Sequence, residues 1–503
     1  MRTDRTPPPF ERVLVANRGE IAIRVIRACR ELLISPIAVH SDADAGALHV
    51  RLADASQRIG PPPATESYLS IDAIIQAALR SGAQAIHPGY GFLSENADFA
   101  RAVESAGLVF IGPPAETLES LGNKLAARRA AKEAGVPIVP GTTVALGGDW
   151  NDLGALGFPL MLKAAAGGGG RGMRRVDTPD EVGVALDAAR REALSAFGDG
   201  TIYVERLLAP ARHVEVQLLG DRHGGLAVLG ERDCSVQRRH QKLVEESPSP
   251  GVETATRDAL FASARRVAGT VDFHNAATVE FLVDADQRHY FLEMNTRLQV
   301  EHGVTEMVTG LDLVAWQIRV AAGEPLSRSV LDATGRGHAI EVRLYAEDPY
   351  DDFRPTAGRV TAWQMPAGPG IRVDAGIEAN TELRPEYDPL LAKLLVHAED
   401  RAGAIDRLRR ALDETLIGGL QTDAGFLRWL VDDEAFISGR YDTRLIADRW
   451  SGDHDLADGD AALAATAALA ARHARTSNPG GPADLGDDGS AWGRLGRREA
   501  LRG

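Results

Sequence analysis

Short apolar runs alternate with segments of helical spacing over the first quarter of the chain. The run at residues 13–16 is entirely apolar, and a polar turn separates it from a helical pattern that begins at residues 21–26. Another apolar run follows at residues 37–39, and the alternation continues to residues 109–111. Such alternation is typical of a doubly wound parallel sheet with helices on both faces. We therefore predict one domain of this kind over residues 1–125.

The hydrophobic pattern changes beyond about residue 137. Residues 213–219 and 278–283 alternate apolar and polar side chains, which predicts strands of a mixed or antiparallel sheet. Further strands are expected towards the C-terminus, followed by helices at residues 402–416 and 422–432. The predicted fold class is therefore α/β at the N-terminus and α+β beyond it.

The end of the chain differs from the rest in composition. Residues 461–474 are rich in alanine, which favours a helix. Residues 476–503 are rich in Gly, Pro, Ser and Asp, which is typical of a mobile tail.

Whole-chain composition indicates a globular protein without membrane spans. The 503 residues suggest two to four domains, and 44% hydrophobic with 25% charged residues is an ordinary balance. No apolar run approaches the roughly 18 residues of a membrane helix. The N-terminal sequence MRTDRTPPPFER has no apolar stretch of the kind a secretory signal needs. We therefore expect a cytoplasmic protein.

Charge and cysteine content exclude two further classes. A net charge of −15 argues against a nucleic-acid binder, which needs a basic surface. The two cysteines, Cys29 and Cys234, are too few for a disulfide framework and lack metal-ligand spacing. We expect two reduced, buried thiols.

Lysine is rare in this chain. Only five of the 56 basic side chains are lysines. Where arginine serves most cationic positions, a retained lysine indicates a need for a compact point charge on a flexible stem. Chance explains Lys132, which lies in a helix-like context. The remaining lysines are Lys124, Lys163, Lys242 and Lys393.

A glycine-rich stretch follows an apolar strand. Residues 167–172 read GGGGRG, after the apolar run at residues 160–162 and Lys163. Glycine lets a backbone approach phosphate closely and present its N–H groups. The combination favours a phosphate-covering loop over a flexible linker, although it is not a P-loop because no GK[ST] follows.

Two glutamates bracket a predicted hairpin. A turn between Asp286 and Gln287 would place Glu280 opposite Glu293, with Asn295 on the same face as Glu293. Two carboxylates at that distance repel each other unless a cation lies between them. Mg²⁺ prefers carboxylates together with nucleotide phosphates, so we favour a metal site over an exposed acidic hairpin.

Two basic segments complete the candidate chemistry. Residues 231–246 are rich in Arg, His and Lys but are flanked by acids, which favours a small-anion pocket over a nucleic-acid strip; a salt-bridged face remains an alternative for Arg238 and Arg239. In extended chain, Arg297, Gln299 and Glu301 line one side. A guanidinium beside a carboxylate can hold an oxyanion and remove its proton, or can form a structural ion pair.

Together these segments resemble the biotin carboxylase family of ATP-grasp enzymes. The matching stretches are VANRGEIAIRVIRACRE (15–31), AIHPGYGFLSEN (85–96), KAAAGGGGRGM (163–173), ERDCSVQRRHQKLVEE (231–246), and EMNTRLQVEH with VTEM and TG (293–310). The resemblance covers residues 10–450. It implies an N-terminal Rossmann-like domain (1–125), an ATP-grasp lid (126–208), an ATP-grasp central domain (209–335), a biotin carboxylase C-terminal domain (336–450) and an extension (451–503).

The resemblance also implies roles for individual residues. ATP would contact Lys124, Lys163, Gly168, Gly169, Gly170, Glu205, His213, Gln237 and His240. Mg²⁺ or Mn²⁺, at two sites, would bind Glu280 and Glu293, helped by Asn295. Bicarbonate would bind Lys242, Arg297, Gln299 and Val300. Glu301 matches the base that deprotonates bicarbonate, Arg343 the residue that stabilises the biotin enolate, and Tyr90 a biotin contact.

The implied reaction is carboxylation of biotin with ATP and bicarbonate, through carboxyphosphate. None of the six methionines is followed by Lys, so the Met-Lys-Met biotin attachment site is absent. We therefore expect biotin to arrive on a separate carrier protein or domain, with a carboxyltransferase subunit and a homodimer as further partners implied by the family. FRPTAG (353–358) resembles acyl-CoA carboxylase α-chains, whereas Gly303 stands where the family usually has Pro.

Two other functions compete with this one. A different ATP-grasp ligase would share Lys163, the glycine loop and the glutamate pair, but would not need RRHQK, RLQVEH and Arg343 together. A non-catalytic nucleotide-binding subunit would be expected to lose Glu280, Glu293 or Glu301, and all three are present. The final acyl acceptor stays open among acetyl-CoA, propionyl-CoA, longer acyl-CoAs and urea.

Overall fold

The computed structural model describes residues 8–122, 124–144, 153, 156–165 and 173–452. The chain divides into two units, Met1–Ser451 and Gly452–Gly503. The predicted helix at 461–474 and the predicted tail at 476–503 lie outside the described residues, as does the glycine loop with Gly168, Gly169 and Gly170.

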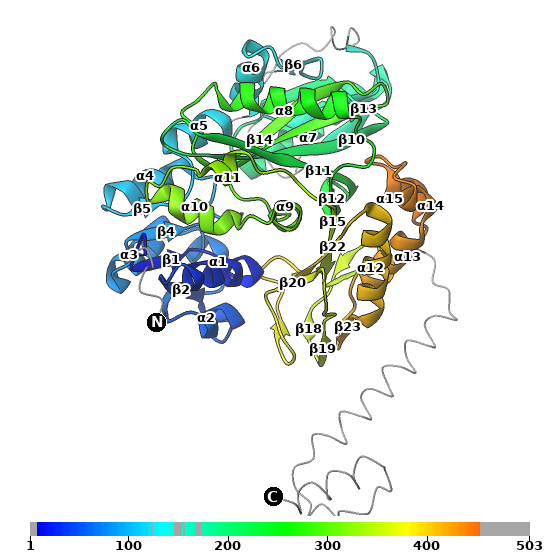
Figure 1. The fold of residues 1–503 in the computed structure, drawn as a ribbon. Coiled ribbons are helices and arrows are strands. Elements are labelled where there is room, and N and C mark those ends of the chain that lie inside the picture. The colour runs from blue at the N-terminus through cyan, green and yellow to red at the C-terminus, as the bar shows by residue number, and fades with distance from the viewer. Residues whose placement is uncertain (1–7, 123, 145–152, 154–155, 166–172, 453–503) are drawn as a thin grey trace, which may run out of the picture. The chain divides into compact units, whose positions relative to one another are not determined.

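A five-stranded parallel sheet forms the N-terminal part, in the order β3-β2-β1-β4-β5 (Figure 1). Successive residues of β1 point to opposite faces: Val13 and Val15 pack in the core with α1, whereas Leu14 packs in the core with α3 and α4. Because both faces of the central strand are covered, β1 is continuously apolar from Val13 to Val15. The predicted doubly wound sheet is confirmed. Its elements are β1 (Arg12–Val15), α1 (Gly19–Glu31), β2 (Ser35–Ser41), α2 (Leu48–Leu52), β3 (Ala55–Gly60), α3 (Ile71–Ser81), β4 (Ala85–His87), α4 (Ala97–Ser105), β5 (Val109–Phe110) and α5 (Ala115–Gly122).

A separate four-stranded sheet follows, in the order β6-β9-β7-β8. Leu186, Ala189 and Ala193 of α7 pack on its apolar side chains, including Leu160 and Leu162. The predicted strand before the glycine loop is confirmed as β7, and Lys163 is its penultimate residue. The elements are α6 (Lys124–Glu133), β6 (Gly141–Val144), β7 (Leu160–Ala164), β8 (Arg174–Val176), α7 (Val182–Phe197) and β9 (Ile202–Arg206).

An eight-stranded antiparallel sheet carries most of the candidate site, in the order β14-β13-β10-β11-β12-β15-β22-β20. The predicted strands at 213–219 and 278–283 are confirmed as the antiparallel neighbours β10 and β13. Since β12 pairs with β15, one sheet continues across residue 336. Its strands and neighbouring helices are β10 (Ala211–Gly220), β11 (Leu226–Arg238), β12 (Gln241–Ser247), α8 (Thr254–Ala268), β13 (Asn275–Asp284), β14 (His289–Asn295), α9 (His302–Thr309), α10 (Leu313–Ala321), α11 (Arg328–Leu331), β15 (His338–Tyr345), β20 (Ile371–Ala375) and β22 (Leu390–Ala398).

Helices and short strands at the C-terminal end cover β15 and β22. The predicted helices at 402–416 and 422–432 are confirmed as α12 and α13, and the Asp400 side chain caps α12 by accepting from the Gly403 N–H. The remaining elements are β16 (Glu347–Asp348), β17 (Arg354–Pro355), β18 (Gly358–Arg359), β19 (Ala362–Gln364), β21 (Glu382–Leu383), α12 (Arg401–Glu414), β23 (Leu416–Gly418), α13 (Ala424–Asp432), α14 (Glu434–Ile437) and α15 (Leu445–Arg449).

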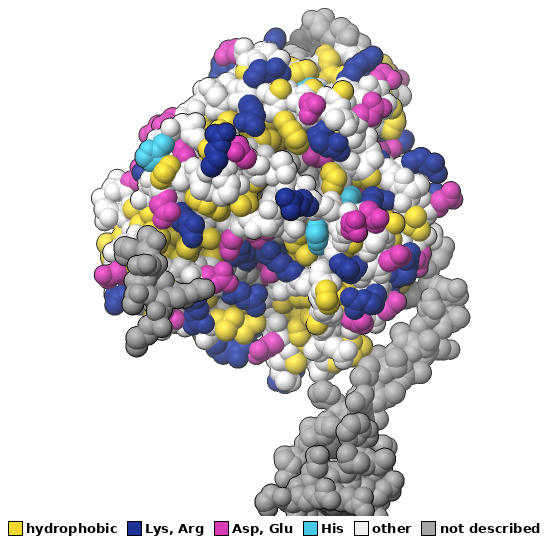
Figure 2. Space-filling model, in the orientation of Figure 1, with side chains coloured by type: hydrophobic (Ala, Val, Ile, Leu, Met, Phe, Trp, Pro, Cys, Tyr) yellow, Lys and Arg dark blue, Asp and Glu magenta, His cyan; other side chains and the backbone are white. Residues whose placement is uncertain are grey.

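The surface mixes charges of both signs. On the face in Figure 2, basic and acidic side chains are interspersed among apolar ones rather than gathered into one basic stripe. Among the described residues, no helix combines the length and the apolar character needed to cross a bilayer.

Candidate active site

Four charged side chains form a row across the large sheet. Arg232 lies opposite Glu215, Glu215 opposite Glu280, and Glu280 opposite Glu293, on β11, β10, β13 and β14 in turn. The predicted pairing of Glu280 with Glu293 is therefore confirmed. A bulge between Glu280 and Phe281 shifts the register by one residue and makes this pairing possible.

The carboxylates of Glu215, Glu280 and Glu293 are neighbours on one sheet face, so cations are needed to offset their repulsion. Lys242 supplies the central one, with its Nζ 2.7 Å from Glu215, 3.1 Å from Glu280 and 2.6 Å from Glu301. Burial lowers the pKa of Lys242, but the surrounding acidic groups raise it well above its usual value. Lys242 is therefore a permanent charge. We call Lys242, Glu215, Glu280 and Glu301 the carboxylate hub.

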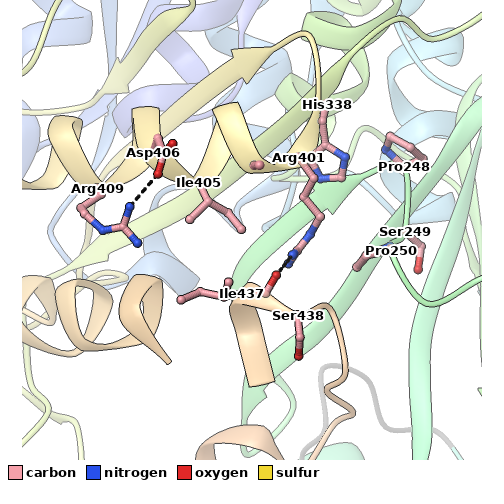
Figure 3. A pocket seen from close by; sticks show the side chains of 11 residues that line it. Pro248, Ser249, Pro250, His338, Arg401, Ile405, Asp406, Arg409, Ile437 and Ser438 are labelled. Atoms are coloured by element: carbon pink, nitrogen blue, oxygen red, sulfur yellow. Dashed lines mark hydrogen bonds and ion pairs between the residues drawn. The ribbon is translucent and has the colours of Figure 1, made fainter. Parts of the chain in front are cut away.

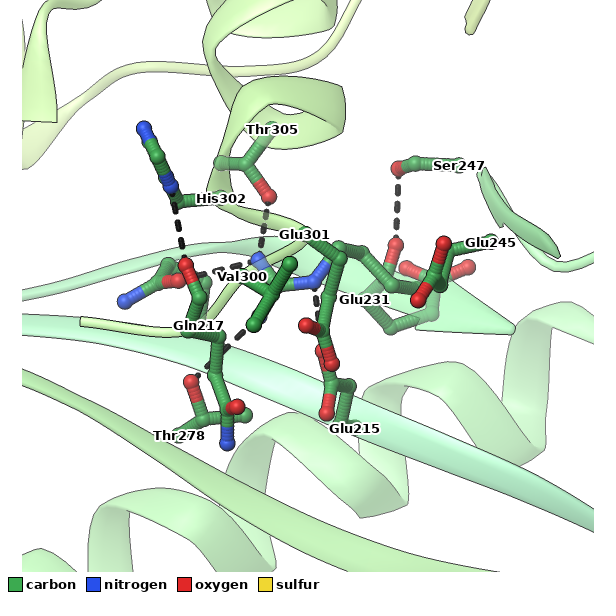
Figure 4. Close-up of polar contacts among 12 residues, drawn as sticks. Glu215, Gln217, Glu231, Glu245, Ser247, Thr278, Val300, Glu301, His302 and Thr305 are labelled. Carbon is green, nitrogen blue, oxygen red and sulfur yellow. Dashed lines mark hydrogen bonds and ion pairs between the residues drawn. The ribbon is translucent and has the colours of Figure 1, made fainter. Parts of the chain in front are cut away.

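Arg232 closes one end of the row. Its fully buried guanidinium donates to Glu215 at 2.6 Å, and Figure 4 shows its other acceptors, Gln217, Thr305 and Thr278, around the same point. A buried guanidinium is stable only when its donors are paired, as they are here. Arg232 therefore fixes Glu215, and through it Lys242.

Glu280 is held in place by four neutral or cationic donors. Burial raises its pKa, but Lys242 and His213 more than offset this and lower it far below the usual range, so Glu280 is a carboxylate. The contacts are His213 Nε2 at 2.6 Å, Asn295 Nδ2 at 2.7 Å, Lys242 Nζ at 3.1 Å and Gln299 Nε2 at 3.3 Å.

The second predicted metal ligand is more open. Glu293 pairs with Lys124 at 3.1 Å, and the two side chains are 26% and 29% exposed, whereas Glu280 is 5% exposed. Two carboxylates facing each other, with an amide beside them, are the hard oxygen donors that suit Mg²⁺. The residues therefore fit a divalent ion, whose charge would be added to that of Lys242 and Lys124.

Glu301 lies at the start of α9, where the chain leaves the large sheet. Its buried carboxylate binds Lys242 and, at 2.9 Å, Nη2 of Arg343 on β15. Burial raises the pKa of Glu301, but Lys242 and Arg343 lower it well below the usual value. The predicted base and the predicted biotin residue are thus in direct contact.

Arg297 and Gln299 lie beside this pair but are arranged differently from the sequence hypothesis. Arg297 donates to Gln299 at 2.9 Å, and its ion-pair partner is Glu95 at 2.9 Å rather than Glu301. Glu95 belongs to the AIHPGYGFLSEN stretch, where sequence reasoning assigned it no role. Its place directly before Asn96, the cap of α4, was the available signal.

The predicted nucleotide-binding residues form small groups of contacts, one of which includes His213, a partner of Glu280 in the hub. Lys163 on β7 contacts Glu205 on β9 at 2.5 Å, and Arg128 lies 3.6 Å from the same glutamate. Gln237 contacts His213 at 3.2 Å. His240 lies exposed at the turn between β11 and β12, with a positive φ of 69°. We call Lys124, Lys163, Glu205, Glu293 and His240 the nucleotide side.

Tyr90 and Lys393 both contact Glu20 on α1, with Lys393 Nζ 3.5 Å from Glu20 Oε1. The Tyr90 hydroxyl donates to Glu20, and Lys393 Nζ donates to the Val300 carbonyl at 2.5 Å. Burial and the Glu20 carboxylate raise the pKa of Tyr90 well above its usual value, while Arg343 acts in the opposite sense. Tyr90 is therefore a neutral donor within electrostatic reach of Arg343. Sequence reasoning gave Lys393 no role, although its rarity was a signal.

Both cysteines are buried free thiols, as expected. Cys234 lies near Glu215 and Glu301, with ligand atoms within 4.8 Å of one another. Burial and the glutamates raise the pKa of Cys234 well above its usual value. It is therefore a neutral thiol and a poor metal ligand.

A pocket of about 540 Å³ lies elsewhere, between Pro248, Pro250 and the helices α12 and α14 (Figure 3). Arg401 lines it, but its guanidinium already binds Glu246 and the carbonyls of Phe436 and Ile437. This pocket shares no residue with the carboxylate hub.

Sequence models of three protein families match consecutive parts of the chain. They are the biotin carboxylase N-terminal domain at residues 9–118, the ATP-binding domain of the carbamoyl-phosphate synthase L chain at residues 123–329, and the biotin carboxylase C-terminal domain at residues 341–448.

Individual proteins give the same result. Biotin carboxylase from Halalkalibacterium halodurans is 48% identical over 440 residues, covering 87% of this chain and 97% of that one. The propionyl-CoA carboxylase alpha chain of Ruegeria pomeroyi is 46% identical over 465 residues, covering 88% of this chain and 68% of that one.

A solved structure extends the match to the fold. It is the biotin carboxylase domain dimer of 2-oxoglutarate carboxylase from Hydrogenobacter thermophilus, in complex with MgADP, ADP and bicarbonate. Its TM-score is 0.86 at 43% identity, and the match covers 88% of this chain and 99% of that chain. The predicted family is confirmed: the chain belongs to the biotin carboxylase family.

Proposed function

We propose that this biotin carboxylase, a ligase driven by ATP, binds bicarbonate beside Lys242, Arg297, Gln299 and Val300 and deprotonates it with Glu301. The observation that carries the assignment is the convergence of Lys242 and Arg343 on the Glu301 carboxylate, at 2.6 and 2.9 Å. A carboxylate between two cations marks a place where a second anion can be held and lose its proton.

The basicity of Glu301 would change as substrate binds. Without substrate, both cations hold the pKa of Glu301 well below its usual range, although burial opposes them. A bound bicarbonate anion would also interact with both cations and so weaken their effect on Glu301. The pKa of Glu301 would therefore rise at the step that needs a base. The deprotonated bicarbonate then attacks the γ-phosphate of ATP, giving ADP and carboxyphosphate.

Glu280 and Glu293, helped by Asn295, would hold Mg²⁺ or Mn²⁺, at up to two sites. When bound, the divalent ion offsets negative charge on the transferred phosphoryl group. The chain contributes the fixed spacing of the two carboxylates through the β13–β14 pairing. The magnesium ADP and bicarbonate in the Hydrogenobacter structure support this assignment.

On nucleotide binding, phosphate groups would replace the carboxylate partners of the lysines on the nucleotide side. Within the described part of the chain, Lys124 and Lys163 each have one carboxylate partner, so a phosphate can replace it at the loss of a single contact. Glu205, His213, Gln237 and His240 would contact the nucleotide, and Gly168, Gly169 and Gly170 would cover its phosphates.

Biotin would enter on a partner, a biotin carboxyl carrier protein or domain. Arg343 would stabilise negative charge on the ureido group, and Tyr90 would contact the same ring. A carboxyltransferase subunit would complete the assembly, and the dimer of the Hydrogenobacter domain supports a homodimer. We expect this assembly in the cytoplasm, with its acyl acceptor set by the carboxyltransferase.

ATP hydrolysis by the purified chain tests the proposal. We expect ADP release to require bicarbonate and to rise further with free biotin. Stimulation by neither would overturn the proposal. ADP release that requires a different carboxylate or an amine would instead favour another ATP-grasp ligase, and nucleotide binding without any hydrolysis a non-catalytic subunit.

A further inference from the structure

We propose that Glu245 is a positioning residue for Arg343, holding its guanidinium in the site at the stage when Glu301 has taken up a proton. This inference rests on the proposed function, since it assumes that Glu301 is the base and that Arg343 acts on biotin. It adds a residue to which neither motif matching nor the hub geometry gives a role.

The geometry places one guanidinium between two carboxylates. Nη2 of Arg343 donates to both Glu245 and Glu301, the latter at 2.9 Å. The Arg343 side chain is 8% exposed, and both glutamate side chains are fully buried. Glu245 lies on β12 and Arg343 on the neighbouring strand β15, so the contact is fixed by the sheet.

Proton transfer to Glu301 removes one of the two negative charges beside Arg343. A protonated Glu301 no longer attracts Arg343 as an ion. A buried guanidinium that loses its only counter-ion is strongly unfavourable and turns towards water or another anion. Glu245 prevents this because it is a second carboxylate on the same nitrogen.

The charge of Glu245 is coupled to that of Glu301. Burial and the neighbouring Glu301 carboxylate together raise the pKa of Glu245 to about 7, although Arg343 acts in the lowering direction. Protonation of Glu301 removes this repulsion, so Glu245 becomes more fully ionised when Arg343 depends on it. Among the described residues, the other charged or titratable groups that face Glu245 are Lys242 on β12, Glu341 on β15 and the neutral thiol of Cys234 on β11.

Glu341 provides a matched control. It lies directly opposite Glu245 in the β12–β15 register and is equally buried. Among the described residues, no donor binds either of its carboxylate oxygens. Burial raises its pKa well above the usual value, against the effect of Lys393, so Glu341 is neutral. Glu341→Gln therefore exchanges one neutral group for another, whereas Glu245→Gln removes the counter-ion of Arg343.

The experiment compares two reactions of the full chain in both variants. One is bicarbonate-dependent ATP hydrolysis without biotin, and the other is carboxylation of free biotin. A hydrogen bond between charged groups affects rates by about 10–100-fold. We expect Glu245→Gln to lower kcat for biotin carboxylation by about that factor and basal hydrolysis by less than about threefold. Glu341→Gln should stay within about threefold of the parent protein in both reactions.

Equal losses in the two reactions, or equal behaviour of the two variants, would overturn the inference. If Glu245→Gln does not fold, as judged by circular dichroism, Glu245→Asp decides: it keeps the charge on a shorter side chain. A selective loss of biotin carboxylation in Glu245→Asp supports positioning, and no selective loss contradicts it. A parent protein inactive in both reactions would instead overturn the proposed function.

Discussion

The carboxylate hub and the nucleotide side use the same residue types in different ways. In the hub, Lys242 serves three glutamates at once, is 11% exposed, and is backed by the fully buried Arg232. On the nucleotide side, Lys124 and Lys163 each have one glutamate partner among the residues that the structure describes, and the Lys124–Glu293 pair is about a quarter exposed. The hub is thus assembled by the fold, whereas the nucleotide side has lysines that a ligand can recruit by breaking one contact.

Loss of the base should give the largest effect. Glu301→Gln keeps the shape of the side chain but cannot take a proton from bicarbonate. We expect bicarbonate-dependent ATP hydrolysis to fall by about 10²–10⁴-fold, the usual contribution of a general base. Steady-state ADP release measures it, with nucleotide affinity as the control, which should change little. A variant with near-parental kcat would remove Glu301 from the role of base.

Loss of the hub lysine should lower stability in addition to activity. Lys242→Met leaves three carboxylates without their shared cation, and breaking a buried ion pair costs about 3–5 kcal/mol. Urea unfolding followed by circular dichroism measures the change in free energy of unfolding. A change below about 1 kcal/mol would mean that the hub behaves like an ordinary surface pair.

The contact between Lys242 and Glu301 predicts that the free energy of unfolding depends on pH. The folded pKa of Glu301 lies well below its ordinary value of 4.5, so its ionisation stabilises the fold above about pH 4.5. This contribution is lost progressively as the pH falls below 4.5 towards the folded pKa. We therefore expect the unfolding free energy of Lys242→Met to depend less steeply on pH below 4.5 than that of the parent protein. Parallel curves would contradict this coupling.

Glu293 belongs to the nucleotide side and lies directly opposite Glu280 of the hub. Glu293→Gln should weaken metal-dependent turnover by about 10–100-fold, as when groups that support a metal site are removed. Because its only ion-pair partner among the described residues is the half-buried Lys124, the free energy of unfolding should hardly change. Titrating Mg²⁺ in the ATP hydrolysis assay checks this, and unchanged kinetics would count against the metal role.

Lys124→Met should have the smallest effect on folding. A partly exposed ion pair contributes about 0–1 kcal/mol, so unfolding in urea should be nearly unaltered. Its nucleotide affinity should nevertheless fall, measured by calorimetric titration with ADP. A destabilisation as large as that of Lys242→Met would erase the difference between the two regions.

Sequence patterns predicted the elements well where periodicity is unambiguous. The parallel N-terminal sheet follows from its alternating apolar runs, and the Glu280–Glu293 pairing from the hairpin spacing. The bulge beside Glu280 could not be predicted, because no residue type marks it. The turn is centred on Asp286, because Val283 lies opposite His289, rather than between Asp286 and Gln287 as predicted, so without the bulge Glu280 would face Leu292.

Contacts between distant segments were the least predictable. Arg297 was placed beside Glu301, whereas its ion-pair partner is Glu95, about 200 positions earlier in the chain. Glu215 could have been identified from the sequence, because it is two residues from His213 on one strand and therefore shares a face with the predicted site. Glu245 gave no such signal, since its partner Arg343 lies on a strand that is remote in sequence. The rarity of lysine marked Lys393, but its contact with the Val300 carbonyl could not be predicted.

Transfer of labelled carbon from bicarbonate to free biotin tests the central claim most directly. The account predicts that labelled carboxybiotin forms only with ATP and a divalent ion, and that Glu301→Gln abolishes both carboxybiotin formation and the bicarbonate-dependent release of ADP. ADP formation that proceeds at the parental rate in Glu301→Gln, or label that reaches biotin without ATP, would contradict it.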